Sequence, residues 1–501
     1  MWHIFIAGRR RTRVSSRRRP DKDRHQDYAL RALTHDRHMT EGRWEWSYVN
    51  CPVRPGFPGN RSDPRRLLDG DEKFHKDPDG FYRDLRRRYG ALAPVELAPG
   101  VPATLVLNWD VAVKIMHDSG HFPSNPEKWQ QSVPQDSPLL AMMAYHPSAR
   151  DSDGAAHTRY REPSVAAIAG VNLFAMHDRV EQIGTRLVNE FLPKGRADLL
   201  SQYVYPLFFD VLNEVFGCPE DIGYRVGAAM HYRFNSRGEA PQAMISLNEA
   251  LAELVEFKRS YPGDDITTRL MQHRVGLDDH EVIAQLLSFC GAGLEAAPNL
   301  VTNALLLMFT DSRFGGGLLY GSLSTRDALD EVLFNNPPMA NFCFFYPRQP
   351  ILIGDVWLPQ HQPVVISIAA CNNDPAITGA DRFGNRSHLS FGAGPHACPA
   401  SKLAYQVAMD AVDLLLDLVP DINLAVPADE LEWRPGVIQR ALVGLPTTFP
   451  RAEFSGPPPG TWPAPFAPIR SGQNAQRTTQ RHRISDGPYQ GAASGPAPAW
   501  G

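Results

Sequence analysis

The residues best suited to chemistry lie in the segment SFGAGPHACPA, which spans residues 390–400. Gly392, Gly394 and Pro395 predict a tight loop whose backbone can come close to a flat ligand. Cys398 stands just before a helical run that begins near Lys402, and the N–H groups at a helix start favour a thiolate. Because the thiolate is the form of cysteine that binds metal ions, Cys398 is a candidate metal ligand.

One cysteine is too few for a structural zinc site, which takes four protein ligands. The six cysteines of the chain lie far apart and form no CxxC pair, which argues against a zinc site and against a disulfide scaffold. An iron porphyrin supplies four ligands of its own and needs a single thiolate on its proximal side. Cys398 meets that need, and His396 is placed to reach a haem propionate. The alternative interpretation is an inert buried cysteine in a glycine-rich turn.

Residues 391–398, FGAGPHAC, resemble the FGxGxHxC haem-ligand signature of the cytochrome P-450 monooxygenases. The resemblance implies heme b (iron protoporphyrin IX) as the cofactor and Cys398 as the iron ligand. It also implies that Phe391, Gly392 and His396 contact the haem.

A second motif lies far upstream of the cysteine loop. His157 and Arg161, in the run HTRYR, resemble the HxxxR of the family's C helix. Their spacing places both side chains on one helical face, where both would meet haem propionates. A solvated helix face is the alternative interpretation. Residues 374–375, 381–383 and 388–391 resemble the family's meander and its entry to the haem loop.

Polar residues are rare in the apolar stretch 279–309, and they are spaced by four. Glu295, Asn299 and Asn303 would line one face of a buried central helix. The resemblance places the family's acid–alcohol pair, which helps to deliver protons for oxygen activation, at Glu295 and Ala296. The usual hydroxyl is therefore absent from this chain.

Pro298 follows shortly after and has no N–H group, so the carbonyl of Leu294 loses its helical partner and a water can occupy the groove. We expect Glu295 to relay protons through that water or through a substrate hydroxyl. The alternative is a structural carboxylate that is satisfied by Asn299 or by a backbone group.

The family's ExxR motif is also incomplete. The corresponding run begins at Glu331 and has Phe334 in place of the arginine, while Arg382 matches the family's meander arginine. A buried carboxylate without a partner costs about 3 to 5 kcal/mol, so we expect Glu331 to pair directly with Arg382. Phe334 would then fill the volume of the missing guanidinium group. A small group of actinobacterial family members shares this loss.

The strand position from which many family members offer a propionate-binding arginine falls at Phe344 or Phe345. Arg348 follows a few residues later and is a weaker candidate. Neutralisation of the propionates is therefore expected to depend on His157, Arg161 and His396.

The elements that must position these residues are mostly helices. Apolar spacing of 3.6 residues predicts helices over 178–191, 199–216, 242–261, 279–309 and 402–418. Strand-like runs are few, and most fall within 343–368. The predicted fold class is mainly α with small β-sheets, and the resemblance implies a cytochrome P-450 fold with haem between the central helix and the helix that follows the cysteine loop.

Composition narrows the remaining possibilities. Apolar residues make up 43% and charged residues 21% of the 501 residues, which excludes wholesale disorder. Residues 1–24 carry a charge of +7, so the rest of the chain carries −11, and an acidic body argues against a nucleic-acid partner. The apolar stretches fall short of the roughly 20 residues that a transmembrane helix needs. We predict a cytoplasmic protein with no transmembrane segment.

The two ends of the chain differ from its body. Residues 1–62 are arginine-rich and read as a disordered extension or as sequence upstream of the true start, and the alternative is a tail for nucleic acid or anionic lipid. Residues 452–501 are dominated by Pro, Gly, Ala, Ser and Gln and are predicted to be disordered. Residues 63–451 are predicted to form a single cytochrome P-450 domain.

The resemblance implies a haem-thiolate monooxygenase that takes electrons from ferredoxin and its reductase and inserts one oxygen atom into a small apolar substrate. The missing acid–alcohol hydroxyl keeps two other functions open. One is a haem-binding accessory or sensor protein with the same fold. The other is a haem enzyme that is driven by peroxide or performs a non-oxidative reaction.

Overall fold

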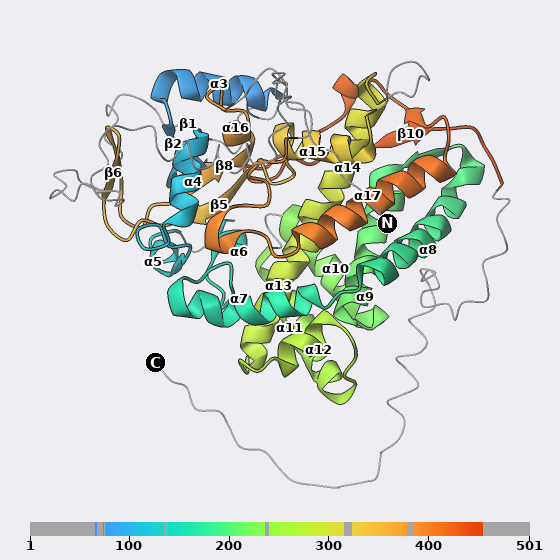
Figure 1. Cartoon of the computed structure of the whole chain (residues 1–501), viewed down its shortest axis with the longest axis horizontal. Helices are drawn as coiled ribbons and strands as arrows, with labels where there is room; N and C mark the ends of the chain where they lie inside the picture. The colour runs from blue at the N-terminus through green and yellow to red at the C-terminus, as the bar shows by residue number, and fades with distance from the viewer. Residues whose placement is uncertain are drawn as a thin grey trace, which may run out of the picture.

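The computed structural model describes residues 66–67, 74, 76–134, 137, 139–235, 240–314, 323–377 and 385–453. Helices dominate this part of the chain, and the strands gather beside them (Figure 1). The predicted N-terminal extension 1–62 lies outside the described residues, as do Arg382 and all of the predicted tail 452–501 except residues 452 and 453. The helices of eight or more residues are α3 Pro78–Tyr89, α4 Trp109–His117, α7 Gly154–Ala169, α8 Leu173–Phe191, α9 Tyr205–Phe216, α10 Glu220–Asn235, α11 Ala240–Ser260, α13 Asp279–Gly291, α14 Ala297–Thr310, α15 Thr325–Asn335 and α17 Ser401–Leu418.

The main sheet has five strands in the order β1-β2-β3-β8-β5. Its strands are β1 Arg66–Leu67, β2 Leu92–Ala98, β3 Val101–Val106, β5 Asn341–Phe345 and β8 Val364–Ser367. The last two fall within the predicted strand region, but β2 and β3 do not. Their prolines conceal the strand pattern. Pro99 and Gly100 make the hairpin turn that joins them, and Gly100 has a φ of 76°, which favours glycine.

A single long helix, Asp279–Thr310, crosses the helical part of the molecule. It consists of α13, a π-helical turn η3 (Ala292–Ala296) and α14. By length and composition alone the helix could span a membrane, which is weak evidence against the expectation of no transmembrane segment. However, 56% of its most apolar stretch is buried inside the protein, which is typical of a core helix. Its apolar residues pack against α9, α11, α15 and α17 in the largest core cluster.

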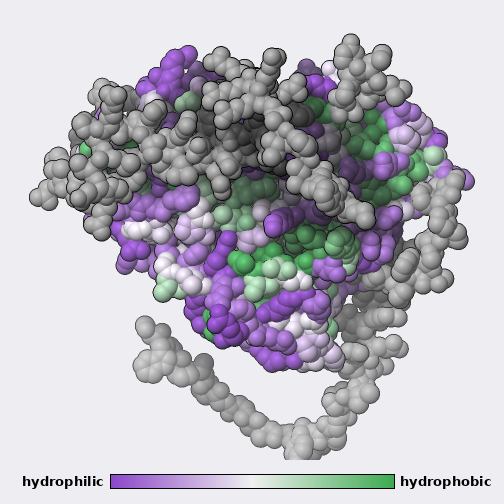
Figure 2. All heavy atoms as spheres, in the orientation of Figure 1, coloured by the Kyte–Doolittle hydropathy of each residue, from purple (hydrophilic) through white to green (hydrophobic). Residues whose placement is uncertain are grey.

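The described surface is mainly hydrophilic, with hydrophobic areas between the polar ones on the face shown in Figure 2. The large apolar side chains that are exposed are Val165, Leu173, Phe174, Tyr224, Tyr232, Ile245, Tyr261, Ile377 and Val443. All five predicted helical stretches coincide with helices in the structure, because each one buries an apolar face in the core.

Candidate functional site

The cysteine loop lies between the sheet region and α17. A short 3-10 turn, η4 (Gly394–His396), precedes Cys398, and α17 begins at Ser401. The amide of Cys398 donates to the carbonyl of Phe391 at 2.7 Å, which closes the loop. Gly394 has a φ of 66°, and a Cβ there would lie 2.4 Å from the backbone oxygen of Met116 at the end of α4. Only glycine fits this position.

The thiol of Cys398 is deep in the protein. Burial raises its pKa, while a backbone hydrogen bond at Ala400 and the nearby Arg161 lower it by smaller amounts. The polypeptide alone therefore favours the thiol, although the sequence predicted a thiolate. Loss of hydration outweighs the helix start, so a bound cation is what would stabilise the thiolate.

The propionate-binding candidates do come together beside this loop. His157 and Arg161 lie on one face of α7; the rings of His157 and His396 have centroids 4.4 Å apart, and Arg161 donates to the carbonyl of Ala397. His396 Nε2 lies 3.6 Å from Asp153 Oδ1. Burial, followed by the neighbouring His396 and Arg161, lowers the pKa of His157 to about 4.

This cluster has more basic groups than acidic ones. His157 is 9% exposed, and within the described part of the chain its Nε2 atom has no hydrogen-bond partner. A buried polar atom without a partner costs free energy, so its presence indicates a ligand that accepts a hydrogen bond or carries negative charge. A haem propionate meets both requirements, and the residues present therefore fit the cofactor that the cysteine loop implies.

Some positions on the central helix and beside the cysteine loop are accessible. Ala292 is exposed and Ala296 is partly exposed, although both lie in the middle of a core helix. Cys343 is similar: burial raises its pKa to about 12, yet its side chain is partly accessible and lies close to Gly392 and Cys398.

Glu295 is bound to groups that the sequence did not reveal. It is 3% exposed, its Oε1 lies 2.9 Å from Arg434 Nη1, and it also accepts from Asn299 Nδ2 at 3.2 Å. Arg434 in turn donates to the hydroxyl of Tyr205 at 3.1 Å. Burial raises the pKa of Glu295, and Arg434 opposes that shift. The arrangement includes the Asn299 contact of the structural alternative and adds an ion pair.

The π-helical turn accommodates Pro298. The amide of Ala297 donates to the carbonyl of Ala292, five residues earlier, so the chain enters α14 with the proline in its first turn. Side chains meet the neighbouring carbonyls: Asn299 Nδ2 donates to the carbonyl of Glu295 at 2.7 Å, and Thr302 Oγ1 to that of Pro298 at 2.9 Å. Ala296 offers no hydroxyl beside this turn.

The incomplete ExxR motif differs from expectation. Glu331 is partly exposed and binds Arg313 at 2.7 Å, so the expectation of a buried carboxylate is wrong. Its predicted pairing with Arg382 involves a residue outside the described part. The buried acid of this helix is Asp330, which binds Arg386 at 2.8 Å and accepts from the hydroxyl of Tyr405 at 2.6 Å.

Phe334 is buried at the end of α15, and its ring meets His388 edge-on, with centroids 5.4 Å apart. Polar residues then connect α15 to the cysteine loop. Asn372 donates to the carbonyl of Leu333 at 2.9 Å and accepts from the amide of Leu389 at 2.8 Å, and Ser390 donates to the same carbonyl. Amide and hydroxyl groups thus support the loop next to the position of the missing arginine.

The strand candidates for propionate binding do not supply a cation. Phe345 is 4% exposed in an apolar cluster with Ile366, and Phe344 packs in a second cluster. Arg348 is exposed.

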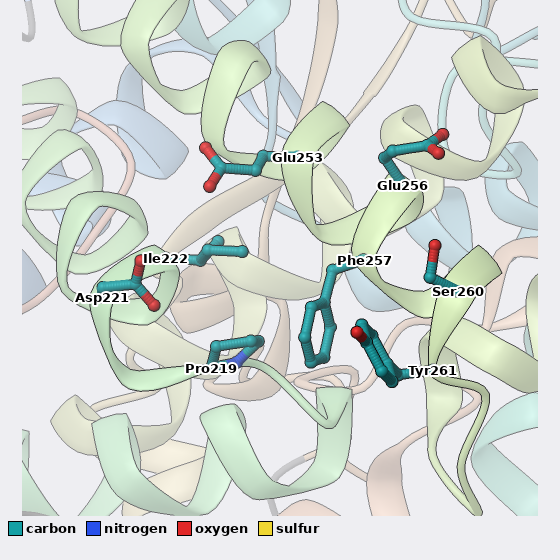
Figure 3. Close-up of a pocket in the computed structure, with 8 residues that line it drawn as sticks. All are labelled: Pro219, Asp221, Ile222, Glu253, Glu256, Phe257, Ser260 and Tyr261. Atoms are coloured by element: carbon teal, nitrogen blue, oxygen red, sulfur yellow. The ribbon is translucent and has the colours of Figure 1, made fainter. Parts of the chain in front are cut away.

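A separate surface pocket of about 360 Å³ lies between α10 and α11, where the rings of Phe257 and Tyr261 stand side by side (Figure 3). Its lining contains none of the predicted site residues.

No protein-family model matches the chain. Among curated proteins, the chain is 30% identical over 380 residues to 2-hydroxy-5-methyl-1-naphthoate 7-hydroxylase of Streptomyces carzinostaticus, covering 72% of this chain and 92% of the relative. It is 29% identical to cytochrome P450 107B1 of Saccharopolyspora erythraea, covering 76% and 97%. Among solved structures, CYP154C4 from Streptomyces sp. W2061 superposes with a TM-score of 0.70 at 28% identity, covering 77% and 98%.

Proposed function

Because this chain belongs to the cytochrome P450 superfamily, we propose that it takes electrons from a ferredoxin and its reductase and inserts one oxygen atom of dioxygen into a small apolar substrate. The chain is a P450 monooxygenase with heme b as its cofactor. The relatives include hydroxylases, among them 6-deoxyerythronolide B hydroxylase of Saccharopolyspora erythraea, which supports hydroxylation here. The observation that carries the proposal is the cysteine loop with His157 beside it, whose Nε2 atom has no hydrogen-bond partner among the described residues.

Cys398 is the proposed iron ligand, and haem bound there supplies the chemistry that activates dioxygen. His157, Arg161 and His396 hold the propionates, since they form a basic cluster that borders the loop. Phe391 and Gly392 are proposed to contact the haem. They belong to the loop that is closed by the hydrogen bond from the Cys398 amide to the Phe391 carbonyl.

The site lacks one of the two groups that usually deliver protons in this family. Glu295 is the proposed proton source, but its carboxylate is bound by Arg434 and Asn299. Ala296 cannot donate a proton, so a water or a substrate hydroxyl has to connect Glu295 to the reacting centre. Pro298 changes the course of the helix at this point, and its carbonyl accepts a hydrogen bond from the Thr302 hydroxyl.

This arrangement favours a second candidate, a haem-binding accessory or sensor protein, or an enzyme that uses peroxide or a non-oxidative reaction. In each of these cases proton delivery to dioxygen is not required. The ion pair of Glu295 with Arg434 and the absence of a hydroxyl at Ala296 would then not impair the function.

Two measurements separate these functions. Addition of carbon monoxide to the reduced haem-loaded protein should give a thiolate-type Soret band, and its absence would refute ligation by Cys398. Substrate-dependent consumption of electrons should then be coupled to an oxygenated product. Peroxide release without product, for every substrate tried, would favour the second candidate.

We also propose a cytoplasmic location and an acidic ferredoxin as the partner. The basic patch expected around His157–Arg161 is partly used inside the protein, because Arg159 binds Glu281 at 2.6 Å and Arg161 binds the loop carbonyl. Docking of ferredoxin would therefore have to use other cations as well. Salt dependence of electron transfer tests this, since a charge-steered encounter slows as ionic strength rises.

A further inference from the structure

A pocket lined by basic side chains lies away from the cysteine loop, where the chain leaves α8 and meets the last strand. Its volume is about 530 Å³, and it is formed by the turn before β4 (Arg196–Asp198) and by the end of β10 (Pro446–Thr448) with the residues that follow. Three of the lining residues are basic and none is acidic. The lining consists of Pro193, Lys194, Gly195, Arg196, Thr448, Phe449 and Arg451.

The backbone of this pocket is held by a small sheet. β4 pairs with β10 in an antiparallel register that sets Arg196 opposite Thr448. The carbonyl of Gly195 accepts a hydrogen bond from the Phe449 amide at 3.1 Å. The ring of Phe449 is buried against Phe191 at the end of α8, with ring centroids 5.7 Å apart. The basic residues therefore start from a fixed backbone.

The side chain of Arg451 passes close to the turn at Gly195. A Cβ atom on Gly195 would lie 2.7 Å from Arg451 Cγ and 3.4 Å from Arg451 Nε. The φ of 69° at this glycine also favours a residue without a side chain. Lys194 and Arg196 flank Gly195 in sequence, so all three basic residues meet at one glycine.

None of the three basic side chains has a partner in the described part of the chain, where they form neither a hydrogen bond nor an ion pair. Acids before and after the turn are bound elsewhere. Glu190 binds Arg186 at 3.4 Å, and Asp198 accepts from the hydroxyl of Ser201 and from the Leu445 amide. Three like charges around one pocket repel one another, and an anion between them relieves that repulsion.

The pocket between α10 and α11 provides a comparison within the same molecule. Its charged lining residues are acidic (Figure 3), and two of them have partners: Glu253 binds Arg225 at 2.6 Å, and Glu256 binds Arg259. The chain after residue 24 carries a net charge of −11. Three unpaired cations in one pocket of an acidic chain therefore indicate an anionic ligand.

We propose that Lys194, Arg196 and Arg451 form a binding site for a small anion with a diphosphate group, either free diphosphate or a nucleoside diphosphate. Guanidinium groups offer paired N–H donors that match phosphate oxygens, and the lysine adds a compact charge. The volume is within the range of roughly 300 to 1,000 Å³ that is typical of small-molecule sites. The site goes beyond the proposed function, since none of these residues belongs to the haem-binding cluster.

An acidic protein such as ferredoxin is the competing occupant, and the position of the pocket argues against it. β9 (Asn423–Leu424) pairs with β10 and follows the end of α17, whereas Cys398 precedes the start of that helix. α17 has 18 residues, so it is about 27 Å long. The pocket and the proposed iron ligand thus lie toward opposite ends of α17 (Figure 1). A ferredoxin bound there would be poorly placed to pass electrons to haem.

The test is isothermal calorimetry on the haem-loaded full chain with diphosphate, ADP and orthophosphate at one ionic strength. We expect diphosphate or ADP to bind at least about 10-fold more tightly than orthophosphate, because a second phosphate group adds charged hydrogen bonds. Tighter binding of ADP would assign the site to a nucleotide, and tighter binding of diphosphate would assign it to the free ion.

Variants then locate the binding. Arg451→Gln should weaken binding of the preferred anion about 10-fold, and Arg451→Lys should weaken it less, because lysine keeps the charge but loses the paired donors. The triple variant Lys194→Gln, Arg196→Gln, Arg451→Gln should abolish it. All three side chains are exposed, so these changes leave the core intact. Arg225→Gln, which removes an arginine of the other pocket, should bind as the parent chain does.

Three results would overturn the proposal. The first is equal binding of orthophosphate and the two diphosphates, or no binding of any of them. The second is binding that persists in the triple variant, which would place the anion on another basic segment such as residues 1–24. The third is a triple variant that slows electron transfer from ferredoxin although the parent chain binds no diphosphate, which would assign these cations to a protein partner.

Discussion

The polar groups beside the cysteine loop and those on the central helix differ in how their charges are paired. On the cysteine side, His157, Arg161 and His396 form a basic cluster in which His157 Nε2 has no partner in the described part of the chain. On the helix side, Glu295, Asn299, Arg434 and Tyr205 bind one another.

The difference lies in which charged groups already have a partner of opposite charge. The basic cluster is incomplete without an anion, so cofactor binding should stabilise it. The Glu295 carboxylate is bound by Arg434 and Asn299, although Asn299 Oδ1 and Arg434 Nη2 have no hydrogen-bond partner in the described part of the chain. It therefore contributes a fixed structure instead of a free proton donor. Four predictions test this contrast, and they are given from the largest expected effect to the smallest.

Removal of the ligand sulfur should have the largest effect. We expect Cys398→Ser to lose the thiolate-type carbon monoxide band entirely and to retain little haem, because a hydroxyl does not replace a thiolate on iron. Absorption spectra and haem content per chain measure this. Cys343→Ser is the matched control, since it removes the neighbouring thiol and should keep both properties. Unchanged spectra in Cys398→Ser would refute the assignment.

Loss of the guanidinium partner of Glu295 should destabilise the fold without removing haem. Arg434→Leu leaves a buried carboxylate unpaired, which costs about 3 to 5 kcal/mol. Denaturant unfolding measures the change. Since burial raises the pKa of Glu295 above its ordinary value of 4.5, the penalty should shrink as the pH falls toward that value, where the unfolded chain also protonates.

Adding Glu295→Gln to Arg434→Leu should recover most of the lost stability, because no unpaired charge then remains. If Arg434→Leu is as stable as the parent chain at neutral pH, the ion pair does not hold the helix side together.

The haem-free protein should lose stability as the pH falls from 6.5 to about 4. Burial lowers the pKa of both His157 and His388 to about 4, so in this range the unfolded chain binds protons that the folded chain does not. Thermal unfolding of the haem-free protein at a series of pH values measures the loss. Propionates next to His157 should weaken it in the haem-loaded protein.

The matched variants His157→Gln and His117→Gln separate a site effect from a general one, because His117 is exposed on α4. Only His157→Gln should flatten the pH dependence and weaken haem retention. Equal behaviour of the two variants would contradict a propionate role for His157.

Restoring the missing hydroxyl should have the smallest effect. Ala296→Thr is expected to raise the fraction of electrons that end in product, since the hydroxyl could connect Glu295 to the reacting centre. The ratio of product to electrons consumed measures this. Ala297→Thr places the same group one residue later and should not help. No gain from Ala296→Thr would mean that a different group supplies the proton.

What the sequence could predict follows from the range of the interactions involved. The cysteine loop is local, because its glycines, its turn and the start of α17 lie within a dozen residues, and so it was identified without a structure. His157 and Arg161 share a helix face through their spacing alone. The five long helices were equally evident from apolar periodicity.

Contacts between distant segments were not predictable in this way. Arg434 reaches Glu295 from a segment far later in the chain. For Glu331 the motif predicted a buried carboxylate. In the structure Glu331 is partly exposed and binds Arg313, whereas the neighbouring Asp330 is buried. Strands β2 and β3 were missed because prolines interrupt their pattern.

Gly394 shows how far the cysteine loop depends on the rest of the chain. The last turn of α4 passes so close that even a methyl group would strike the Met116 oxygen. The conformation of the loop is thus determined partly by a helix that lies nearly three hundred positions earlier in the chain. A transfer of the loop alone into a different helical protein would accordingly move the motif without the backbone that fixes its conformation. The end of α4 would have to be transferred as well.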